Sequence, residues 1–280
     1  MRYLIVNADD LGISSGVNRG ILEAYQQGIV NSTTAMVNLP AAAAGIQLMQ
    51  QQAPAVGIGL HFTFTRGRPV LPPDQVPSLV GANGQFYSLP EFMQRNPNFN
   101  AAELRAEMEA QLARFIQLAG WLPDHFDAHH YVTYLNPDMF DMMLKLATRH
   151  KLPIRSAEKH MTLDAMRQVF MGRGYPATVV DTLPQMILQM YAANPKPLWP
   201  DSVEGGFYRD GANLETLLGI LQNLRHGVTE LMCHPGYVDD LDDPYREPRE
   251  AELQALLHPR VREVIAAEDI QLIKFSELPR

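Results

Sequence analysis

The chain has 280 residues, of which 46% are hydrophobic and 19% are charged, a balance typical of a globular protein with a large buried core. The formal net charge is −8, and the sequence has no cluster of lysine and arginine that could follow a phosphate backbone, which argues against nucleic acid as a partner. Cys233 is the single cysteine, and we find neither a signal peptide nor an uninterrupted apolar run of about 20 residues. We therefore expect a cytoplasmic protein without a membrane span.

Short apolar runs alternate with segments of helical periodicity along most of the chain. Residues 3–6 form the first predicted strand, which we expect to end at Asn7 because a buried strand could not hold the polar residues that follow. Ser14 or Ser15 can cap the next helix, and Gly28 suits a left-handed stop beyond its last turn. The other predicted strands are 34–37, 56–64, 125–131, 153–155, 229–233 and 270–275, and the other predicted helices are 41–51, 101–119, 137–150, 214–224 and 249–257.

This alternation predicts a parallel sheet with right-handed crossovers, and we favour an α/β barrel over a doubly wound sheet. A single domain over residues 1–280 is expected, because barrels of this kind commonly occupy about 250 residues. Two stretches, 65–100 and 157–209, depart from the pattern and are rich in proline. We expect them to be long loops that shape a binding cleft or a subunit contact.

Four polar clusters directly follow predicted strands, where a parallel α/β fold places its active site. The clusters lie at residues 7–10, 60–62, 127–130 and 233–236. Each is weak when taken alone. Their shared position is more informative, because chance would scatter histidines over helix surfaces and loops as well.

The residues in these clusters are typical of a metal site. Adjacent carboxylates such as Asp9 and Asp10 repel each other unless a cation or a proton lies between them, although either could instead cap the next helix. His61 could be a ligand or a hydrogen-bonded core residue. His129 and His130 should point to opposite faces of a strand, so only one of them can face the same centre as His61. One carboxylate and two imidazoles leave room for water and substrate, which is typical of a catalytic metal.

The same segments resemble the YdjC-like family of carbohydrate deacetylases, which includes the chitooligosaccharide deacetylase type. Residues 4–12 and 28–34 resemble its first two conserved stretches, and residues 59–62 match its Gly-x-His-hydrophobic element. Residues 126–130 match its Asp-Ser-His-His-His run, and residues 232–235 match its C-terminal His-Pro element. The chain departs from the family at Ala128, which replaces the usual serine, and at Tyr131 and Thr133, which stand where further histidines are common. These differences bear on substrate choice, because the first histidine of the run is kept.

The resemblance implies a distorted (β/α) barrel related to that of other polysaccharide deacetylases, in a homodimer that uses magnesium or another divalent ion. Asp10, His61 and His129 would bind the cation, and two imidazoles also suit zinc, with manganese and cobalt as further options. Asp9 would act as general base. Asp127 could orient a ligand histidine or cap a turn.

The activity that the resemblance implies is metal-dependent hydrolysis of the acetamide group of an N-acetylated sugar or oligosaccharide, with release of acetate. His234 would be the general acid that protonates the departing amine, although an isolated His-Pro could also cap a loop carbonyl. A non-haem iron oxygenase also uses two histidines and a carboxylate, but usually on a β-sandwich. A non-catalytic carbohydrate- or metal-binding protein is the other alternative, and it has no use for an unligated base and acid.

Overall fold

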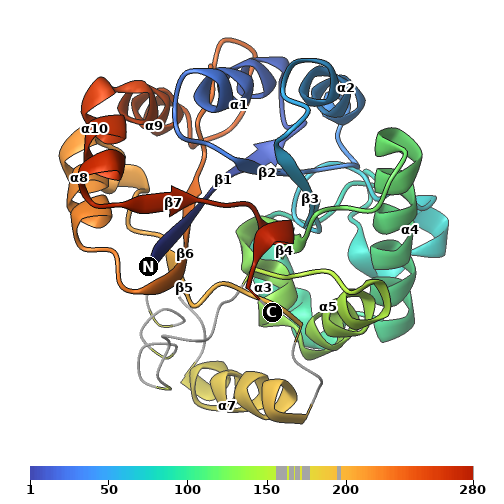
Figure 1. Ribbon diagram of the computed structural model, residues 1–280. Coiled ribbons are helices and arrows are strands. Elements are labelled where there is room, and N and C mark those ends of the chain that lie inside the picture. The colour runs from blue at the N-terminus through green and yellow to red at the C-terminus, as the bar shows by residue number, and fades with distance from the viewer. Residues whose placement is uncertain (156–162, 164–166, 168–170, 172–176, 194–196, 280) are drawn as a thin grey trace.

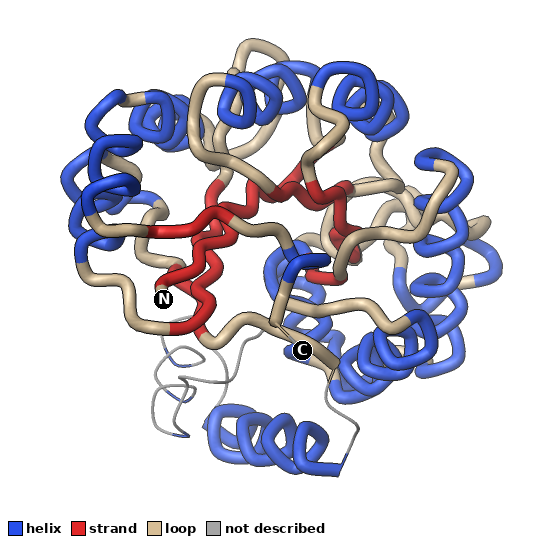
Figure 2. Tube along the Cα trace, viewed as in Figure 1, coloured by secondary structure: helices blue, strands red, loops and turns tan. Residues whose placement is uncertain are grey.

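The computed structural model describes residues 1–155, 163, 167, 171, 177–193 and 197–279 (Figure 1). Its centre is a seven-stranded parallel sheet curled into a half-barrel, with the order β4-β3-β2-β1-β6-β5 and with β7 paired to β1. Figure 2 shows the strands at the centre and the helices around them. The prediction of a distorted α/β barrel is confirmed.

The central strand β1 (Arg2–Leu11) pairs with β6 (Gly227–Cys233) along one edge. Its other edge is shared by β7 (Ile270–Leu272), which pairs with the first residues, and β2 (Ser32–Ala35), which pairs with the last. The remaining strands are β3 (Gly57–Phe62), β4 (Phe126–Ala128) and β5 (Ser202–Glu204). Because all these pairings are parallel, the carboxyl ends of the strands meet at one edge of the sheet.

The strand β1 is longer than predicted, and the expectation that it ends at Asn7 is wrong. Polar residues remain in the strand because they have buried partners: the Asn7 amide donates to Asp9 at 2.8 Å. Towards β2 the register shifts between Ala8 and Leu11, where Asp9 and Asp10 of β1 lie opposite the single residue Thr34 of β2. Asp10 has a φ of 71° in this bulge. The bulge brings the side chains of two successive aspartates to one end of the sheet.

The first helix begins as predicted and ends differently. In α1 (Ser15–Gln26) the Ser14 side chain accepts a hydrogen bond from the Val17 N–H. Gly28 does not adopt the left-handed conformation expected for it. A Cβ at Gly28 would lie 2.9 Å from the Leu256 carbonyl oxygen, so this glycine allows close chain approach instead.

The other helices are α2 (Ala42–Gln52), α3 (Leu89–Arg95), α4 (Ala101–Ala119), α5 (Pro137–His150), α7 (Ala177–Ala193), α8 (Leu214–Gln222), α9 (Glu247–Leu257) and α10 (Pro259–Ala267). Two of them, α3 and α7, lie in segments that we expected to be loops, and part of the segment 157–209 lies outside the described residues. The strand predicted at 153–155 is reduced to a single bridge between Phe126 and Ile154. Within the described part of the chain, no helix is long and apolar enough to cross a bilayer.

Candidate active site

Asp10, His61 and His129 converge at the carboxyl edge of the sheet, as their positions after strands predicted. Nε2 of His61 lies 3.3 Å from Oδ1 of Asp10, and Nδ1 of His129 lies 2.9 Å from the same oxygen. All three side chains are buried, and each can offer a ligand atom within 4.8 Å of the others. Despite these short distances Oδ1 of Asp10 makes no hydrogen bond of normal geometry, and Nε2 of His129 is buried without a hydrogen-bond partner, which suits a cation site.

The chain turns sharply after β4, so the prediction that this strand runs to Tyr131 is wrong. His130 and Tyr131 both have a φ of 56°, in the left-handed region. The rings of His129 and His130 are 3.9 Å apart rather than on opposite faces of a strand. His130 is exposed and contacts the Thr65 hydroxyl at 2.9 Å. His129 faces Asp10 because of this turn rather than because of strand alternation.

Asp127 lies beside His61, as expected for a residue that orients a ligand. Its Oδ1 is 2.7 Å from Nδ1 of His61, and its Oδ2 accepts a hydrogen bond from the Thr34 hydroxyl at 3.1 Å. Nε2 of His61 is thereby turned towards Asp10. Burial disfavours the charged imidazole, but Asp127, Asp10 and Asp9 outweigh it and raise the pKa of His61 to about 10. A cation at this centre would therefore have to displace a proton.

Asp9 is held by Arg155, a residue that the sequence did not single out. Arg155 donates two hydrogen bonds to the two carboxylate oxygens, at 2.8 and 2.6 Å. Burial raises the pKa of Asp9, but the guanidinium outweighs it and holds this pKa well below its ordinary value. Asp9 is therefore ionised at neutral pH and able to accept a proton, although its low pKa makes it a weak base.

Negative charge exceeds positive charge around this centre. Arg155 also lies 3.1 Å from Asp127 and 2.7 Å from Glu230, and Arg249 of α9 donates to Oδ2 of Asp10 at 2.6 Å. Four carboxylates thus face two guanidinium groups: Asp9, Asp10, Asp127 and Glu230 against Arg155 and Arg249. With neutral imidazoles and ionised carboxylates, the difference equals the charge of one divalent cation. Without such a cation, protons on histidine compensate for the excess negative charge, in line with the raised pKa of His61.

A second group of possible ligands is less suited to a cation. Asp9, His61 and Asp127 also bring ligand atoms within 4.8 Å of one another. Arg155 contacts both of these aspartates, however, and its fixed positive charge opposes a cation there. The group centred on Asp10 is therefore the better candidate.

His234 follows β6 and lies beside the predicted base. Its Nε2 is 3.9 Å from Oδ2 of Asp9, and its side chain is 13% exposed, so the site reaches solvent on this side. Burial lowers the pKa of His234, but Glu252 and Asp9 outweigh it and raise this pKa above its ordinary value. The imidazolium form that a general acid needs is thereby favoured.

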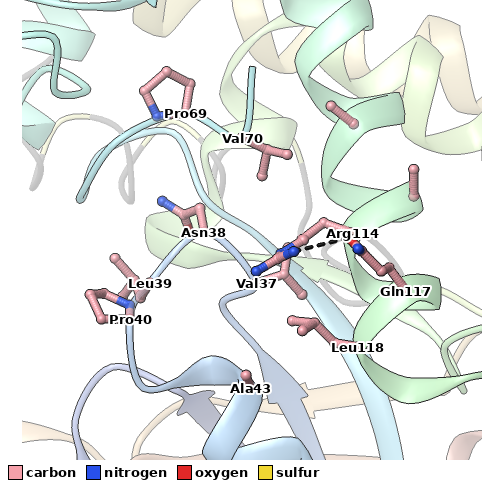
Figure 3. Close-up of a pocket in the computed structure, with 12 residues that line it drawn as sticks. Val37, Asn38, Leu39, Pro40, Ala43, Pro69, Val70, Arg114, Gln117 and Leu118 are labelled. Carbon is pink, nitrogen blue, oxygen red and sulfur yellow. Dashed lines mark hydrogen bonds between the residues drawn. The ribbon is translucent and has the colours of Figure 1, made fainter. Parts of the chain in front are cut away.

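A separate groove lies on the outside of the barrel, between the β2–α2 loop and α4 (Figure 3). Its volume is about 810 Å³, and its walls include Val37, Leu39, Pro69 and Leu118. Arg114 points along the groove and donates to Gln117 at 2.9 Å. None of its lining residues belongs to the buried cluster described above, so the groove is not the candidate active site.

The chain is similar to proteins of one known family along nearly its whole length. A family model described as YdjC-like protein matches residues 3–267. The chain is 35% identical to the carbohydrate deacetylase of Geobacillus stearothermophilus, over 99% of this chain and 98% of that protein. It is 33% identical to the chitooligosaccharide deacetylase of Serratia marcescens, over 99% of both chains. A crystal structure of a proposed cellobiose-phosphate cleavage protein from Enterococcus faecalis V583 shares the fold, with a TM-score of 0.83 and 31% identity over 100% of this chain and 99% of that one.

Proposed function

Because the chain belongs to the YdjC-like family, we propose that it is a carbohydrate deacetylase, a hydrolase that removes the acetyl group from an N-acetylated sugar or oligosaccharide in a metal-dependent reaction. The observation that carries this proposal is the convergence of Asp10, His61 and His129 on one centre, with Asp9 and His234 beside it. The names of the curated relatives support a sugar substrate.

Asp10, His61 and His129 would hold the divalent cation. The ion, when bound, supplies Lewis-acid activation of the amide carbonyl and of a water molecule. Two imidazoles with one carboxylate fit zinc, manganese or cobalt, whereas the family resemblance favours magnesium. Asp127 keeps His61 oriented, and Arg249 holds Asp10 ionised.

The remaining residues move protons. Asp9, kept ionised by Arg155, accepts the proton of the attacking water. His234 donates a proton to the sugar nitrogen as the C–N bond breaks, because an unprotonated amine anion is a very poor leaving group. The 3.9 Å distance between Nε2 of His234 and Oδ2 of Asp9 supports the proposal that base and acid act on one reaction centre.

Acetate release from a panel of N-acetylated sugars and chitooligosaccharides tests the proposal. The wild-type protein, freed of metal and reloaded with Mg²⁺ or Zn²⁺, should release acetate. Asp9→Asn should be slower by about a hundredfold or more, since general base catalysis contributes on this scale. Asp269→Asn is the matched control, because Asp269 precedes β7 at the opposite edge of the sheet and asparagine tolerates its φ of 50°.

The outcomes also separate the alternatives. Equal rates for Asp9→Asn and wild type would refute Asp9 as general base, and no acetate release from the whole panel would favour a non-catalytic binding protein. The parallel α/β sheet argues against a non-haem iron oxygenase, whose sites usually lie on a β-sandwich. The homodimer and the cytoplasmic location stay predictions.

A further inference from the structure

Glu252 is a buried carboxylate that neither the metal centre nor the predicted base uses. It lies on α9 with no exposed surface. One of its oxygens, Oε2, accepts a hydrogen bond from the backbone N–H of His234, and the other, Oε1, accepts one from the Tyr245 hydroxyl. Both donors are neutral, so the positive charge that a buried carboxylate needs has to come from Arg249, one turn away on α9, and from the His234 ring.

The His234 ring lies between two carboxylates. Its Nε2 is 3.9 Å from Oδ2 of Asp9, and its Nδ1 is 3.8 Å from Oε1 of Glu252. Nδ1 is buried and has no hydrogen-bond partner, so Glu252 is well placed to become its acceptor through a small rotation of the ring. One ring nitrogen thus faces the reaction centre and the other faces Glu252.

We propose that Glu252 is the positioning residue of the general acid: its carboxylate holds Nδ1–H of His234, so that Nε2–H points at the sugar nitrogen, and Tyr245 fixes the carboxylate. This inference rests on the proposed function. When the C–N bond breaks, its electron pair goes to nitrogen, which takes the proton from Nε2. His234 is left neutral with Nδ1–H still held by Glu252, and solvent later returns the proton to Nε2.

The groups that surround His234 come from four parts of the fold. Asp9 and Asp10 of β1 and Glu252 of α9 supply negative charge. The Tyr208 and Tyr245 rings flank the imidazole, with centroids at 5.3 and 5.6 Å. The Tyr245 hydroxyl also accepts the N–H of the residue after Tyr208 at 3.0 Å, which ties the β5–α8 loop to the carboxylate of Glu252. Of these groups, Glu252 alone faces Nδ1 across an ion-pair distance in the described residues.

An NMR titration of the histidine rings in the Mg²⁺-loaded protein tests this assignment without depending on turnover. The His234 signal is identified by its loss in His234→Gln. In Glu252→Gln we expect the pKa of His234 to fall by about one unit or more, the usual effect of removing a neighbouring opposite charge. Tyr245→Phe should give a smaller fall and serves as the second variant where Glu252→Gln fails to fold. Glu250→Gln, an exposed change on the same helix, should leave the pKa unchanged.

The pH profile of acetate release supplies the functional readout. Since the acid must be protonated, the alkaline limb of kcat/KM should move to lower pH in Glu252→Gln by the same amount as the pKa. Hydrolysis of 4-nitrophenyl acetate, whose leaving group needs no proton, should lose much less activity in this variant than acetate release from the sugar. An unchanged pKa of His234, or an equal loss on both substrates, overturns the role of Glu252. A wild type that releases no acetate from any sugar refutes the proposed function instead, while the titration still decides whether Glu252 holds His234.

Discussion

Arg155→Met removes a buried cation from the centre of the barrel. The guanidinium nitrogens lie 2.6 to 3.1 Å from oxygens of Asp9, Asp127 and Glu230, and Arg155 has no exposed surface. Methionine keeps much of the apolar stem but leaves three carboxylates without their counterion. Loss of one partner of a buried ion pair costs about 3–5 kcal/mol, and we expect the upper end of this range at neutral pH because three partners are affected. The melting temperature should fall by roughly 10 to 20 °C.

The pH dependence of this loss provides a sharper test. In the wild type the pKa of Asp9 is lower in the folded protein than in the unfolded chain. Its ionisation therefore stabilises the fold at pH values above the unfolded pKa, and this contribution is lost as the pH falls through the folded pKa. Without Arg155, burial raises the pKa of Asp9 in the folded protein. Stability then falls as the pH rises from the unfolded pKa towards the folded pKa. The difference between wild type and variant should therefore be smaller at about pH 5 than at about pH 7.5.

Thermal unfolding followed by circular dichroism at these two pH values measures both effects. Arg149→Met is the control, because Arg149 is 57% exposed in a surface ion pair, and its loss should stay within about 0.5 kcal/mol at either pH. A loss below about 1 kcal/mol for Arg155→Met, or one that does not shrink towards acid pH, would refute the reasoning.

Three further predictions follow from other contacts in the structure. Asp127→Ala should weaken Mg²⁺ or Zn²⁺ binding by about 10- to 100-fold in calorimetry, since it removes the group that orients His61, and an unchanged affinity would contradict this. Because the pKa of His61 is raised to about 10, cation binding at neutral pH should release about one proton and strengthen as the pH rises; a binding enthalpy independent of the buffer would argue against it. Gly59→Ala should destabilise the fold by about 1–3 kcal/mol, because its Cβ would lie 2.5 Å from the His125 ring, which stacks on Phe275, and an unchanged melting temperature would exclude this overpacking.

The helix boundaries that could be predicted are those set by local groups. The bounds of α4 and α5 match the prediction because Asn100 and Asn136 cap their first turns, and Gly120 and Lys151 end them in the left-handed conformation. The length of β1 depends instead on distant partners. Its polar half remains in the strand only because Arg155 and other remote side chains satisfy it, and no local pattern carries this information.

The candidate site also contains residues that could be predicted from the sequence and residues that could not. Asp10, His61 and His129 could be found because polar residues directly after apolar strands are uncommon and share one edge of the sheet. Arg155 is 146 residues from Asp9, and a lone arginine in a short apolar segment is indistinguishable in sequence from a surface residue. The sequence therefore predicts the residues of the candidate site better than the counterions that make their burial possible.

The helix α9 connects the two halves of the site. Arg249 and Glu252 are three residues apart and therefore project from one face of this helix. Arg249 donates a hydrogen bond to Asp10, a proposed cation ligand, and Glu252 favours the imidazolium form of His234, the proposed general acid. The same helix face therefore contacts both Asp10, a proposed cation ligand, and His234, the proposed general acid. The charged residues Arg249 and Glu252 of α9, which in sequence are typical of a solvated helix, thus face the interior and support different side chains of the candidate site.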